Sequence, residues 1–253
     1  MLLTVDVGNT HIRLGVFPVD GGPLVRTWSV RTSPSVTSDE LALTIRGLLG
    51  DCAHRLSGIS AMSVVPSVTG ELRRMGADYW PELRSVVVAP GVKTGVPLLV
   101  DNPREVGSDR VVNALAAHSL FDGPVVVVDV DTATTVDAVS ARGELLGGAI
   151  APGIDISVDA LAERAAALRK IEVVRPRGAL GKNTVAALQA GIVIGFAGQI
   201  DALVDRLRAD VPELADASVV LTGLRADVVS GESRTITDVE PDLALEGLRL
   251  VYE

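Results

Sequence analysis

The chain contains two segments in which a carboxylate ends an apolar run and is followed by small, hydroxyl-bearing residues. Residues 2–17 read LLTVDVGNTHIRLGVF, with Asp6 before a turn of glycine, asparagine and threonine. Residues 125–150 read VVVVDVDTATTVDAVSARGELLGGAI, with Asp129 in the corresponding place. Glycine in such a turn lets backbone N–H groups approach phosphate oxygens, and the carboxylate can hold Mg²⁺ directly or through water. The repeat, about 120 residues apart, predicts two related lobes that face one ligand.

A third candidate lies between the two hairpins, where residues 107–110 read GSDR at the start of a predicted helix. The amides of such a turn can point at an anion, with the helix dipole behind them. The residues alone also allow a structural interpretation, in which Ser108 or Asp109 is the helix N-cap beside Arg110. An isolated DxGNT is likewise compatible with a plain hairpin turn whose asparagine and glycine have positive φ.

Residues 181–184 read GKNT, which looks like the end of a Walker phosphate loop. That motif needs a glycine five residues before the Gly-Lys pair and a serine or threonine directly after it. Pro176 and Asn183 occupy these two places. The Walker interpretation therefore fails.

The elements that must position these residues follow from hydrophobic periodicity and helix caps. The first half predicts strands at 2–7, 12–17, 25–31, 59–64 and 85–88, and helices at 37–50, 67–75 and 108–120. Thr37 and Glu40 form a capping box at the first of these helices. The second half predicts strands at 125–130, 134–139, 145–150, 218–221 and 235–237, and helices at 154–168, 184–208, near 225 and 242–252. We therefore expect an α/β protein of two βββαβαβα lobes, 1–121 and 122–253.

Composition restricts the classes of partner. The net charge of -9 and 22% charged residues argue against nucleic-acid binding through a basic face, so local donors must hold an anionic substrate. Cys52, the single cysteine, excludes an internal disulfide and a thiolate metal cluster. The start MLLTVDVG lacks the basic region of a signal peptide. The most apolar helical stretch, residues 185–200, is shorter than the ~20 residues of a membrane span. We expect a cytoplasmic protein that does not bind membranes.

The duplicated layout resembles the superfamily of acetate and sugar kinases, heat-shock ATPases and actin. Its ribonuclease H-like lobes each contribute an Asp-bearing hairpin to a nucleotide held in the cleft between them. Five segments narrow the resemblance: DVGNT at 6–10, DNPREVGSDRVVNALAAH at 101–118, GGAIAPGI at 147–154, GKNT at 181–184 and LEGLRLVYE at 245–253. Together and in this order, they resemble the type III pantothenate kinases.

The resemblance implies ATP-dependent phosphorylation of pantothenate to 4'-phosphopantothenate, the first step of coenzyme A biosynthesis. It implies Mg²⁺ with ATP and an activating K⁺ or NH₄⁺, with Asp129 as a ligand of the monovalent cation and Asp6 near Mg²⁺. Asp109 would be the base that accepts the proton of the pantothenate hydroxyl. Pantothenate contacts are assigned by resemblance to Gly107, Ser108, Asp109, Arg110 and Thr184. ATP contacts are assigned to Asp6, Val7, Gly8, Asn9, Thr10, His11, Ile12, Arg13 and Thr132.

Three glycines of the predicted helix 184–208 share one side of it: Gly191, Gly195 and Gly198. Spacings of three and four residues permit a close backbone approach. On the sequence alone, packing within the chain explains them slightly better than any other account. The resemblance, however, implies a homodimer with pantothenate bound near the subunit interface, and we therefore expect a homodimer.

Two positions depart from the family pattern. The second loop of the family normally reads Asp, an apolar or aromatic residue, Gly, Thr, but here Asp131 replaces the glycine. A β-carbon there limits the turn conformations, and like charges ~4 Å apart in a partly shielded cleft cost on the order of 4 kcal/mol. Leu224 replaces the second glycine of a Thr-Gly-Gly segment near the adenosine. These changes leave an alternative open, a catalytically impaired family member that acts as a ligand-binding or regulatory protein.

Overall fold

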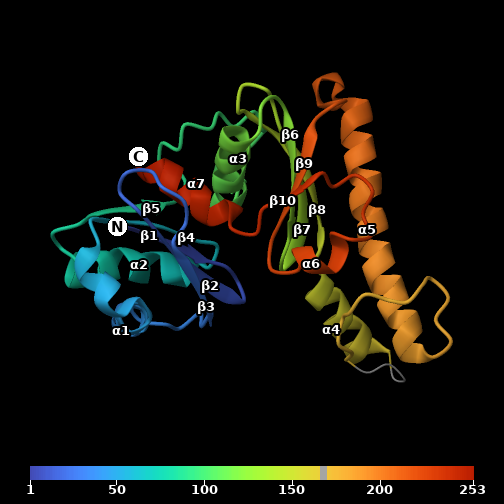
Figure 1. Cartoon of the computed structure of the whole chain (residues 1–253), viewed down its shortest axis with the longest axis horizontal. Helices are drawn as coiled ribbons and strands as arrows, with labels where there is room; N and C mark the ends of the chain where they lie inside the picture. Colours follow the sequence, from blue (N-terminus) through green and yellow to red (C-terminus); the bar gives the residue numbers. More distant parts are fainter. Residues whose placement is uncertain (166–169) are drawn as a thin grey trace. The chain divides into compact units, whose positions relative to one another are not determined.

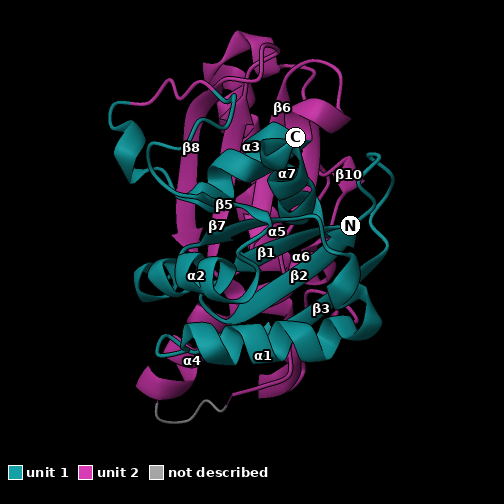
Figure 2. Cartoon of the chain, turned by 90° about the vertical axis from the view of Figure 1, so that its left-hand side faces the viewer, with its two compact units in different colours: residues 1–96, 101–116, 242–253 teal, residues 97–100, 117–241 magenta. Residues whose placement is uncertain are grey.

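The computed structural model describes residues 1–165 and 170–253, which form two compact units (Figure 2). Unit 1 comprises Met1–Val96, Asp101–Ala116 and Asp242–Glu253, and unit 2 comprises Pro97–Val100 and Ala117–Pro241. Each unit contains a five-stranded sheet. This division differs from the sequence halves 1–121 and 122–253 chiefly because the C-terminal segment packs on the sheet of unit 1.

Unit 1 is built on the strands β1 (Leu2–Val7), β2 (His11–Phe17), β3 (Arg26–Arg31), β4 (Gly58–Ser63) and β5 (Arg84–Val88). They lie in the order β3-β2-β1-β4-β5, with β1 antiparallel to β2 and parallel to β4. The helices of this unit are α1 (Ser38–Leu49), α2 (Pro66–Tyr79), α7 (Leu243–Tyr252) and α3 (Ser108–Leu120), the last up to Ala116 (Figure 1).

Unit 2 repeats this plan with the strands β6 (Val125–Val130), β7 (Ala133–Val139), β8 (Leu145–Pro152), β9 (Ser218–Thr222) and β10 (Asp238–Val239). Their order is β10-β9-β6-β7-β8, with β6 antiparallel to β7 and parallel to β9. Its helices are α4 (Ile154–Arg164), α5 (Thr184–Asp210) and α6 (Ala226–Val229). Because both central strands have the same two neighbours in the same directions, the predicted duplication is confirmed.

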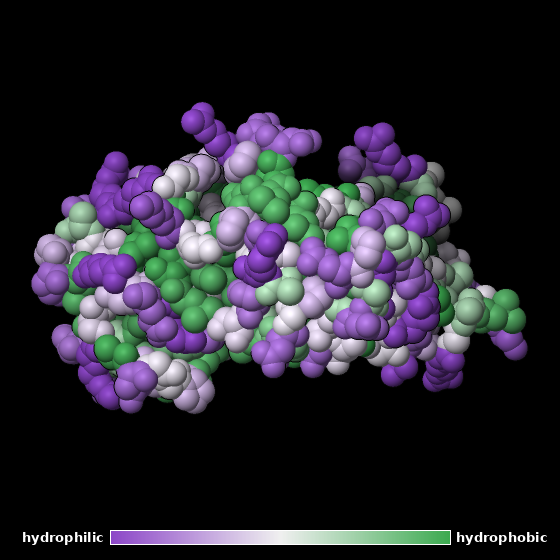
Figure 3. All heavy atoms as spheres, turned by 90° about the horizontal axis from the view of Figure 1, so that it is seen from above, coloured by the Kyte–Doolittle hydropathy of each residue, from purple (hydrophilic) through white to green (hydrophobic). Residues whose placement is uncertain are grey.

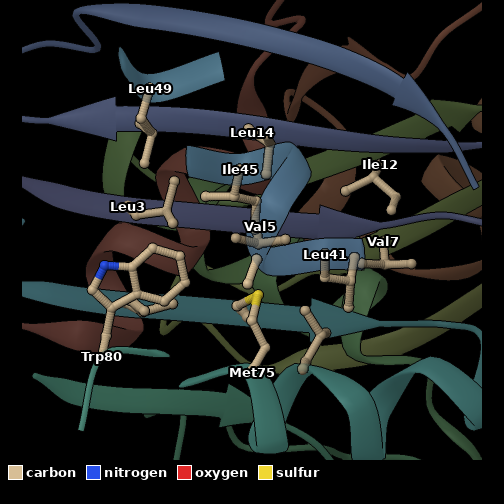
Figure 4. Close-up of a cluster of buried hydrophobic side chains, with 14 of the residues drawn as sticks. Leu3, Val5, Val7, Ile12, Leu14, Leu41, Ile45, Leu49, Met75 and Trp80 are labelled. Atoms are coloured by element: carbon tan, nitrogen blue, oxygen red, sulfur yellow. The ribbon is translucent and has the colours of Figure 1, made fainter. Parts of the chain in front are cut away.

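The core of unit 1 forms between its sheet and the helices α1 and α2. Figure 4 shows the alternate β1 residues Leu3 and Val5 pointing toward Ile45 and Met75, and all four are buried. Burying each such side chain contributes about 1.5–3 kcal/mol relative to leaving it exposed. The predicted capping box begins α1, because the Glu40 N–H donates to Thr37 Oγ1 at 3.3 Å and the Thr37 N–H donates to Glu40 Oε2 at 2.9 Å.

The opposite face of the same sheet is covered by α7. Leu2 and Phe17 pack against Leu245 there, and side chains alternate between faces along a strand, so Leu2 and Leu3 face opposite sides. A Cβ on Gly247 would lie 2.1 Å from the carbonyl oxygen of Val112. Glycine at this position therefore allows the backbones of α7 and α3 to touch.

Several predicted elements differ in detail from the observed ones, among them the helix expected at 67–75, which is observed as α2 and continues to Tyr79. The strand expected at 235–237 is observed as β10, because the Thr235 N–H and hydroxyl donate instead to the carboxylate of Asp201, at 3.1 and 2.7 Å. The helix expected near 225 begins at Ala226. The helix expected at 154–168 is observed as α4, which ends at Arg164, and residues 166–169 lie outside the described residues.

Among the described residues, α5 is long and apolar enough to span a membrane by length and composition. It is longer than the apolar stretch that the sequence indicated, and 39% of its most apolar window is buried. Its buried face, which includes Val193, Ala197 and Ile200, belongs to the core of unit 2. Hydrophobic side chains also occur among hydrophilic ones on the protein face drawn in Figure 3.

The glycine stripe of α5 lies on its exposed side. Gly191, Gly195 and Gly198 are exposed, and a Cβ on any of them would meet no described residue within 4 Å. Packing within the chain, the explanation that the sequence alone slightly favoured, is therefore wrong. The close approach that these glycines permit is directed away from the fold.

Candidate functional site

The predicted site residues fall into two groups, one in each unit. The first hairpin and the GSDR segment belong to unit 1, and the second hairpin and the start of α5 belong to unit 2. Each group is built by strand ends and helix starts within its own unit. The two groups are therefore described in turn.

In the first hairpin, Asp6 lies near the carboxyl end of the central strand β1. Its register partners are Arg13 on β2 and Met62 on β4. The guanidinium of Arg13 pairs with the carboxylate of Asp242, the residue that precedes α7. The strand that leaves the loop is thus tied to the last helix of the chain.

The turn of this hairpin is fixed through its backbone. The Gly8 N–H donates to the His11 carbonyl at 2.9 Å, and Thr32 donates its hydroxyl to the Gly8 carbonyl at 2.8 Å and its N–H to the Thr10 carbonyl at 2.9 Å. Neither Gly8 nor Asn9 has a positive φ, so the positive-φ conformation that the sequence left open for this turn is not observed. Asn9 and Thr10 remain exposed, which leaves their polar groups accessible to a ligand.

The GSDR segment places Asp109 in the first turn of α3. Gly107 precedes the helix, and its carbonyl accepts the Val111 N–H at 3.3 Å. Gly107 is therefore the N-cap, and the assignment of that role to Ser108 or Asp109 is wrong. A Cβ on Gly107 would lie 2.2 Å from Asp109 Oδ1, so glycine makes room for the carboxylate.

Burial raises the pKa of Asp109, although hydrogen bonds from the N–H groups of Arg110 and of Asp109 itself, together with the charge of Arg110, act to lower it. Desolvation disfavours the charged form of a carboxyl group, and here it outweighs the donors. A carboxylate with a raised pKa is a better proton acceptor near neutral pH. The geometry and the electrostatics of Asp109 therefore suit a general base.

In the second hairpin, Asp129 lies near the end of β6, with Thr135 on β7 and Thr222 on β9 as its register partners. The hydroxyl oxygens of Thr132 and Thr134 are buried and make no hydrogen bond within the described part of the chain. Leaving a buried hydroxyl unsatisfied costs about 1–3 kcal/mol, so both mark a place where a ligand or ion can supply the missing partner. Thr134 was missed by the sequence analysis, although the run of threonines in TATT was a signal for it.

The residues around Asp129 fit a hard monovalent cation. Gly223 has φ +99°, and a Cβ there would lie 2.5 Å from both Asp129 Oδ1 and the Val130 carbonyl oxygen. A carboxylate oxygen and a carbonyl oxygen therefore both lie close to Gly223, and hard cations prefer such oxygens. Within the described ranges no group of three or more His, Cys, Asp or Glu side chains is placed to hold a metal. A cation here would depend on backbone and hydroxyl oxygens beside the single carboxylate.

The two departures from the family pattern fit the backbone without strain. Neither Asp131 nor Leu224 has a positive φ, so the restriction expected from a β-carbon at position 131 is not observed. The turn is held by the Asp131 N–H, which donates to the Ala133 carbonyl at 2.9 Å, and by the Gly153 N–H, which donates to the Thr132 carbonyl at 3.0 Å. What distinguishes this loop is therefore the added negative charge.

An arginine that the sequence analysis missed lies beside the same loop. The Arg225 N–H donates to the Val130 carbonyl at 2.9 Å, and its guanidinium donates to both carboxylate oxygens of Asp155, at 2.9 and 2.6 Å. The pKa of Arg225 is raised chiefly by this bond to Asp155, against the effect of burial, and also by the negative charges of Asp227 and Asp131. Its only signal in the sequence was its position directly after the TGL segment.

Thr184 is the first residue of α5 and is exposed. The preceding Asn183 caps this helix, because its Oδ1 accepts the Ala186 N–H at 2.9 Å. A cavity of about 470 Å³ lies beside it, lined by residues that include Arg175, Arg177 and Lys182. Arg175 is paired with Glu232, so the positive charges of Arg177 and Lys182, beside the start of a long helix, make this environment suited to an anionic substrate.

Comparison with known proteins identifies the family. The model of the type III pantothenate kinase family matches residues 2–206. The type III pantothenate kinase of Rhodococcus erythropolis is 57% identical over 257 residues, which cover 100% of this chain and 95% of that protein. The type III pantothenate kinase of Saccharopolyspora erythraea is 58% identical over 260 residues, which cover 100% and 98%.

Solved structures agree on the fold. A ROK family protein from Streptococcus pneumoniae in complex with sucrose has a TM-score of 0.58 at 14% identity and covers 99% of this chain and 96% of its own. The inorganic polyphosphate/ATP-glucomannokinase from Arthrobacter has a TM-score of 0.54 at 14% identity, with coverage of 99% and 98%. These neighbours show the duplicated ribonuclease H-like fold of sugar kinases. The family model and the full-length relatives together show that this chain belongs to the type III pantothenate kinase family.

Proposed function

We propose that the chain transfers a phosphoryl group from ATP to the primary hydroxyl of pantothenate with Asp109 as the base. The reaction yields 4'-phosphopantothenate and is the first step of coenzyme A biosynthesis, the activity for which the relatives are named. The observation that carries the assignment is Asp109 itself, a carboxylate of raised pKa in the first turn of α3, with space made for it by Gly107.

The transition state of phosphoryl transfer is loose, so a base contributes mainly by orienting the nucleophile. The carboxylate of Asp109 would accept the hydroxyl proton of pantothenate as the new P–O bond forms and the bond to ADP breaks. The amides of the first turn of α3, with Ser108 and Arg110, would hold the rest of the substrate. Thr184 is assigned to pantothenate as well, and the cationic cavity beside it supports a site for the carboxylate of pantothenate.

The two hairpins would hold the phosphates of ATP, the first through residues 6–13 and the second through Thr132. The buried hydroxyl of Thr132 supports this role, because a phosphate oxygen would accept its hydrogen bond. Asp6 is assigned to Mg²⁺, and Asp129 to K⁺ or NH₄⁺. When bound, these cations would neutralise charge that develops on the phosphates.

The protein is proposed to act as a cytoplasmic homodimer that binds neither nucleic acid nor membrane. The exposed glycines of α5 support a dimer, because they allow a second helix to approach closely. In this proposal unit 1 carries the first phosphate loop, and unit 2 carries the second loop and the dimer helix. A regulatory protein without kinase activity gains no support, since the relatives are named as kinases.

The test is ATP-dependent phosphorylation of pantothenate in the presence of Mg²⁺ and K⁺. The unmodified protein should turn over, and Asp109→Asn should lower kcat by about 10²–10⁴-fold with little change in pantothenate binding. The matched control is Asp216→Asn, an exposed carboxylate, which should keep its activity. A folded Asp109→Asn protein with normal kcat would remove the base assignment, and an inactive unmodified protein would contradict the kinase function.

A further inference from the structure

Asp131 lies in the turn of the second phosphate loop, and Arg225 and Asp155 lie close to the backbone hydrogen bonds that hold this turn, with Asp227 as a further carboxylate near Arg225. The loop lies between two backbone donors, the N–H of Arg225 on Val130 and the N–H of Gly153 on Thr132. Arg225 and Asp155 follow directly from these anchor points, and Asp131 lies within the turn itself. The two hydrogen bonds therefore hold the backbone of Arg225 and the segment that precedes Asp155 beside the loop.

The guanidinium of Arg225 is oriented by a two-pronged pair with Asp155. Its Nε and Nη2 each donate to a different oxygen of that carboxylate, at 2.9 and 2.6 Å. A forked pair of this kind restricts the direction of the guanidinium plane. Its side chain is 39% exposed, and that of Asp155 is 50% exposed, so solvent and ligands can reach the arginine. The charge of Asp131 also acts on Arg225.

We propose that Arg225 is a positioning residue that offsets the charge of Asp131, so that the second loop accepts the phosphates of ATP although a carboxylate stands in the place of a glycine. Asp155 supports this role because it holds the guanidinium beside the loop. The inference rests on the placement of ATP at this loop under the proposed function. It adds a residue that neither the motifs nor the family pattern assigned.

The proposed offset predicts how substitutions at positions 131 and 225 combine in their effect on ATP binding. Without Arg225, Asp131 would repel the phosphates at full strength, since partly shielded charges a few ångströms apart interact strongly. With Asp131 replaced by glycine, Arg225 still balances Asp155 but no longer offsets a charge within the turn, so its loss should weaken ATP binding less. If the pair of Asp155 and Arg225 served only to stabilise the fold, Arg225→Gln would instead weaken ATP binding equally with aspartate and with glycine at position 131. The coupling between positions 131 and 225 therefore separates the two accounts.

The experiment is a double-mutant cycle of Arg225→Gln and Asp131→Gly in the full chain with Mg²⁺ and K⁺. The readouts are the Kd for ATP by calorimetry, the KM values for ATP and for pantothenate, and kcat. Arg225→Gln should weaken ATP binding by about tenfold or more in the unmodified background and by less than about threefold in the Asp131→Gly background. The KM for pantothenate should change by less than about twofold.

Arg142→Gln is the matched control, because this exposed arginine pairs with Glu144 in the hairpin after β7, and it should leave all four readouts unchanged. Arg225→Lys keeps the positive charge but cannot form the two-pronged pair with Asp155. This variant tests the proposal if the Arg225→Gln protein does not fold. It should weaken ATP binding less than Arg225→Gln does, and only when Asp131 is present.

Equal effects of the Arg225 substitutions in both backgrounds, or no effect in either, would overturn the offset while leaving the kinase function intact. Failure of the unmodified protein to bind ATP would overturn both proposals. A normal melting temperature for each variant would show that the binding changes are not losses of folded protein.

Discussion

The two Asp-bearing hairpins have the same topology but differ in the source of the positive charge beside them. In unit 1, Arg13 stands opposite Asp6 in the register of β1 and β2, so the hairpin supplies its own arginine. In unit 2 the register partner of Asp129 is Thr135, and the arginine beside the loop is Arg225, which follows β9. The duplication has therefore kept the strand order and changed the source of positive charge.

In both units a distant carboxylate holds the arginine. Asp242 pairs with Arg13 across 229 residues of sequence, and Asp155 pairs with Arg225 across 70 residues. The charge that a loop presents to phosphate thus depends on contacts far along the chain. The comparison teaches that similar strand-end motifs need not be electrostatically equivalent.

The largest effect is expected when the carboxylate of the second loop is moved into the first. Gly8→Asp places a charge two residues after Asp6, as Asp131 stands two residues after Asp129, in a hairpin whose own arginine, Arg13, is paired with Asp242. The KM for ATP should rise by about a hundredfold. Gly8→Asn is the matched control of similar size without the charge, and equal KM values for the two variants would show that shape rather than charge sets the difference between the loops.

Among the substitutions that test stability, Asp201→Asn in unit 2 should cause the largest loss. This buried carboxylate accepts hydrogen bonds from the Ser233 and Thr235 hydroxyls, both at 2.7 Å. Because these are hydrogen bonds to a buried charge, the free energy of unfolding should fall by about 2 kcal/mol at pH 7. Urea unfolding measures it, with the exposed Asp205→Asn as the control.

The stabilisation from Asp201 should depend on pH in a defined direction. Burial acts to raise the pKa of Asp201, but the hydrogen bonds from Ser233, Thr235 and the backbone N–H groups outweigh it and lower the pKa. The unfolded chain then binds the proton more readily than the folded one. The contribution is complete above the unfolded-state pKa of about 3.9 and is lost as the pH falls through the lower folded value. An Asp201→Asn difference that stays constant down to pH 2 would contradict this account.

The contribution of Asp109 to the stability of unit 1 should depend on pH in the opposite direction to that of Asp201, because burial raises the pKa of Asp109 in the folded state. The charged carboxylate costs stability above the folded pKa, and the cost disappears below the unfolded value of about 3.9. Asp109→Asn should therefore be more stable than the unmodified protein at pH 7, and the difference should shrink as the pH falls. Melting temperatures between pH 4 and 7.5 would measure it, and a difference between the two proteins that does not change with pH would contradict the raised pKa.

The two arginine pairs should differ in stability because they differ in exposure. The side chain of Arg13 is 17% exposed, whereas that of Arg225 is 39% exposed. Arg13→Gln should lower the free energy of unfolding by about 1–2 kcal/mol, and Arg225→Gln by less than about 1 kcal/mol. Denaturant unfolding of both variants checks the order, and a larger loss for Arg225→Gln would reverse the comparison.

The smallest effect is expected at Leu224, where the family glycine is replaced. Because Leu224 has no positive φ, Leu224→Gly should add only backbone entropy to the unfolded state and lower stability by about 0.5–1 kcal/mol. The KM for ATP should change by less than about twofold. A large decrease of that KM would show instead that the leucine obstructs the nucleotide.

Local features of the fold were predictable because neighbouring residues determine them. The capping box of Thr37 and Glu40 and the hairpins of β1–β2 and β6–β7 depend on residues close in sequence, and they are observed as predicted. The family motifs also indicated Asp109 by type and position. Its raised pKa was not predictable, because burial depends on side chains packed around it from elsewhere in the chain.

The sequence by itself determined the duplicated order of strands and helices, the two Asp-bearing hairpins and the family. Tertiary structure decided that α7 covers the sheet of unit 1, that the α5 glycines are exposed, and that Arg225 and Asp155 meet beside Asp131. Periodicity and capping act over a few residues, so they can be read along the chain. A charge pair or a covered face requires segments far apart in sequence to meet, and only the folded chain specifies which segments do so.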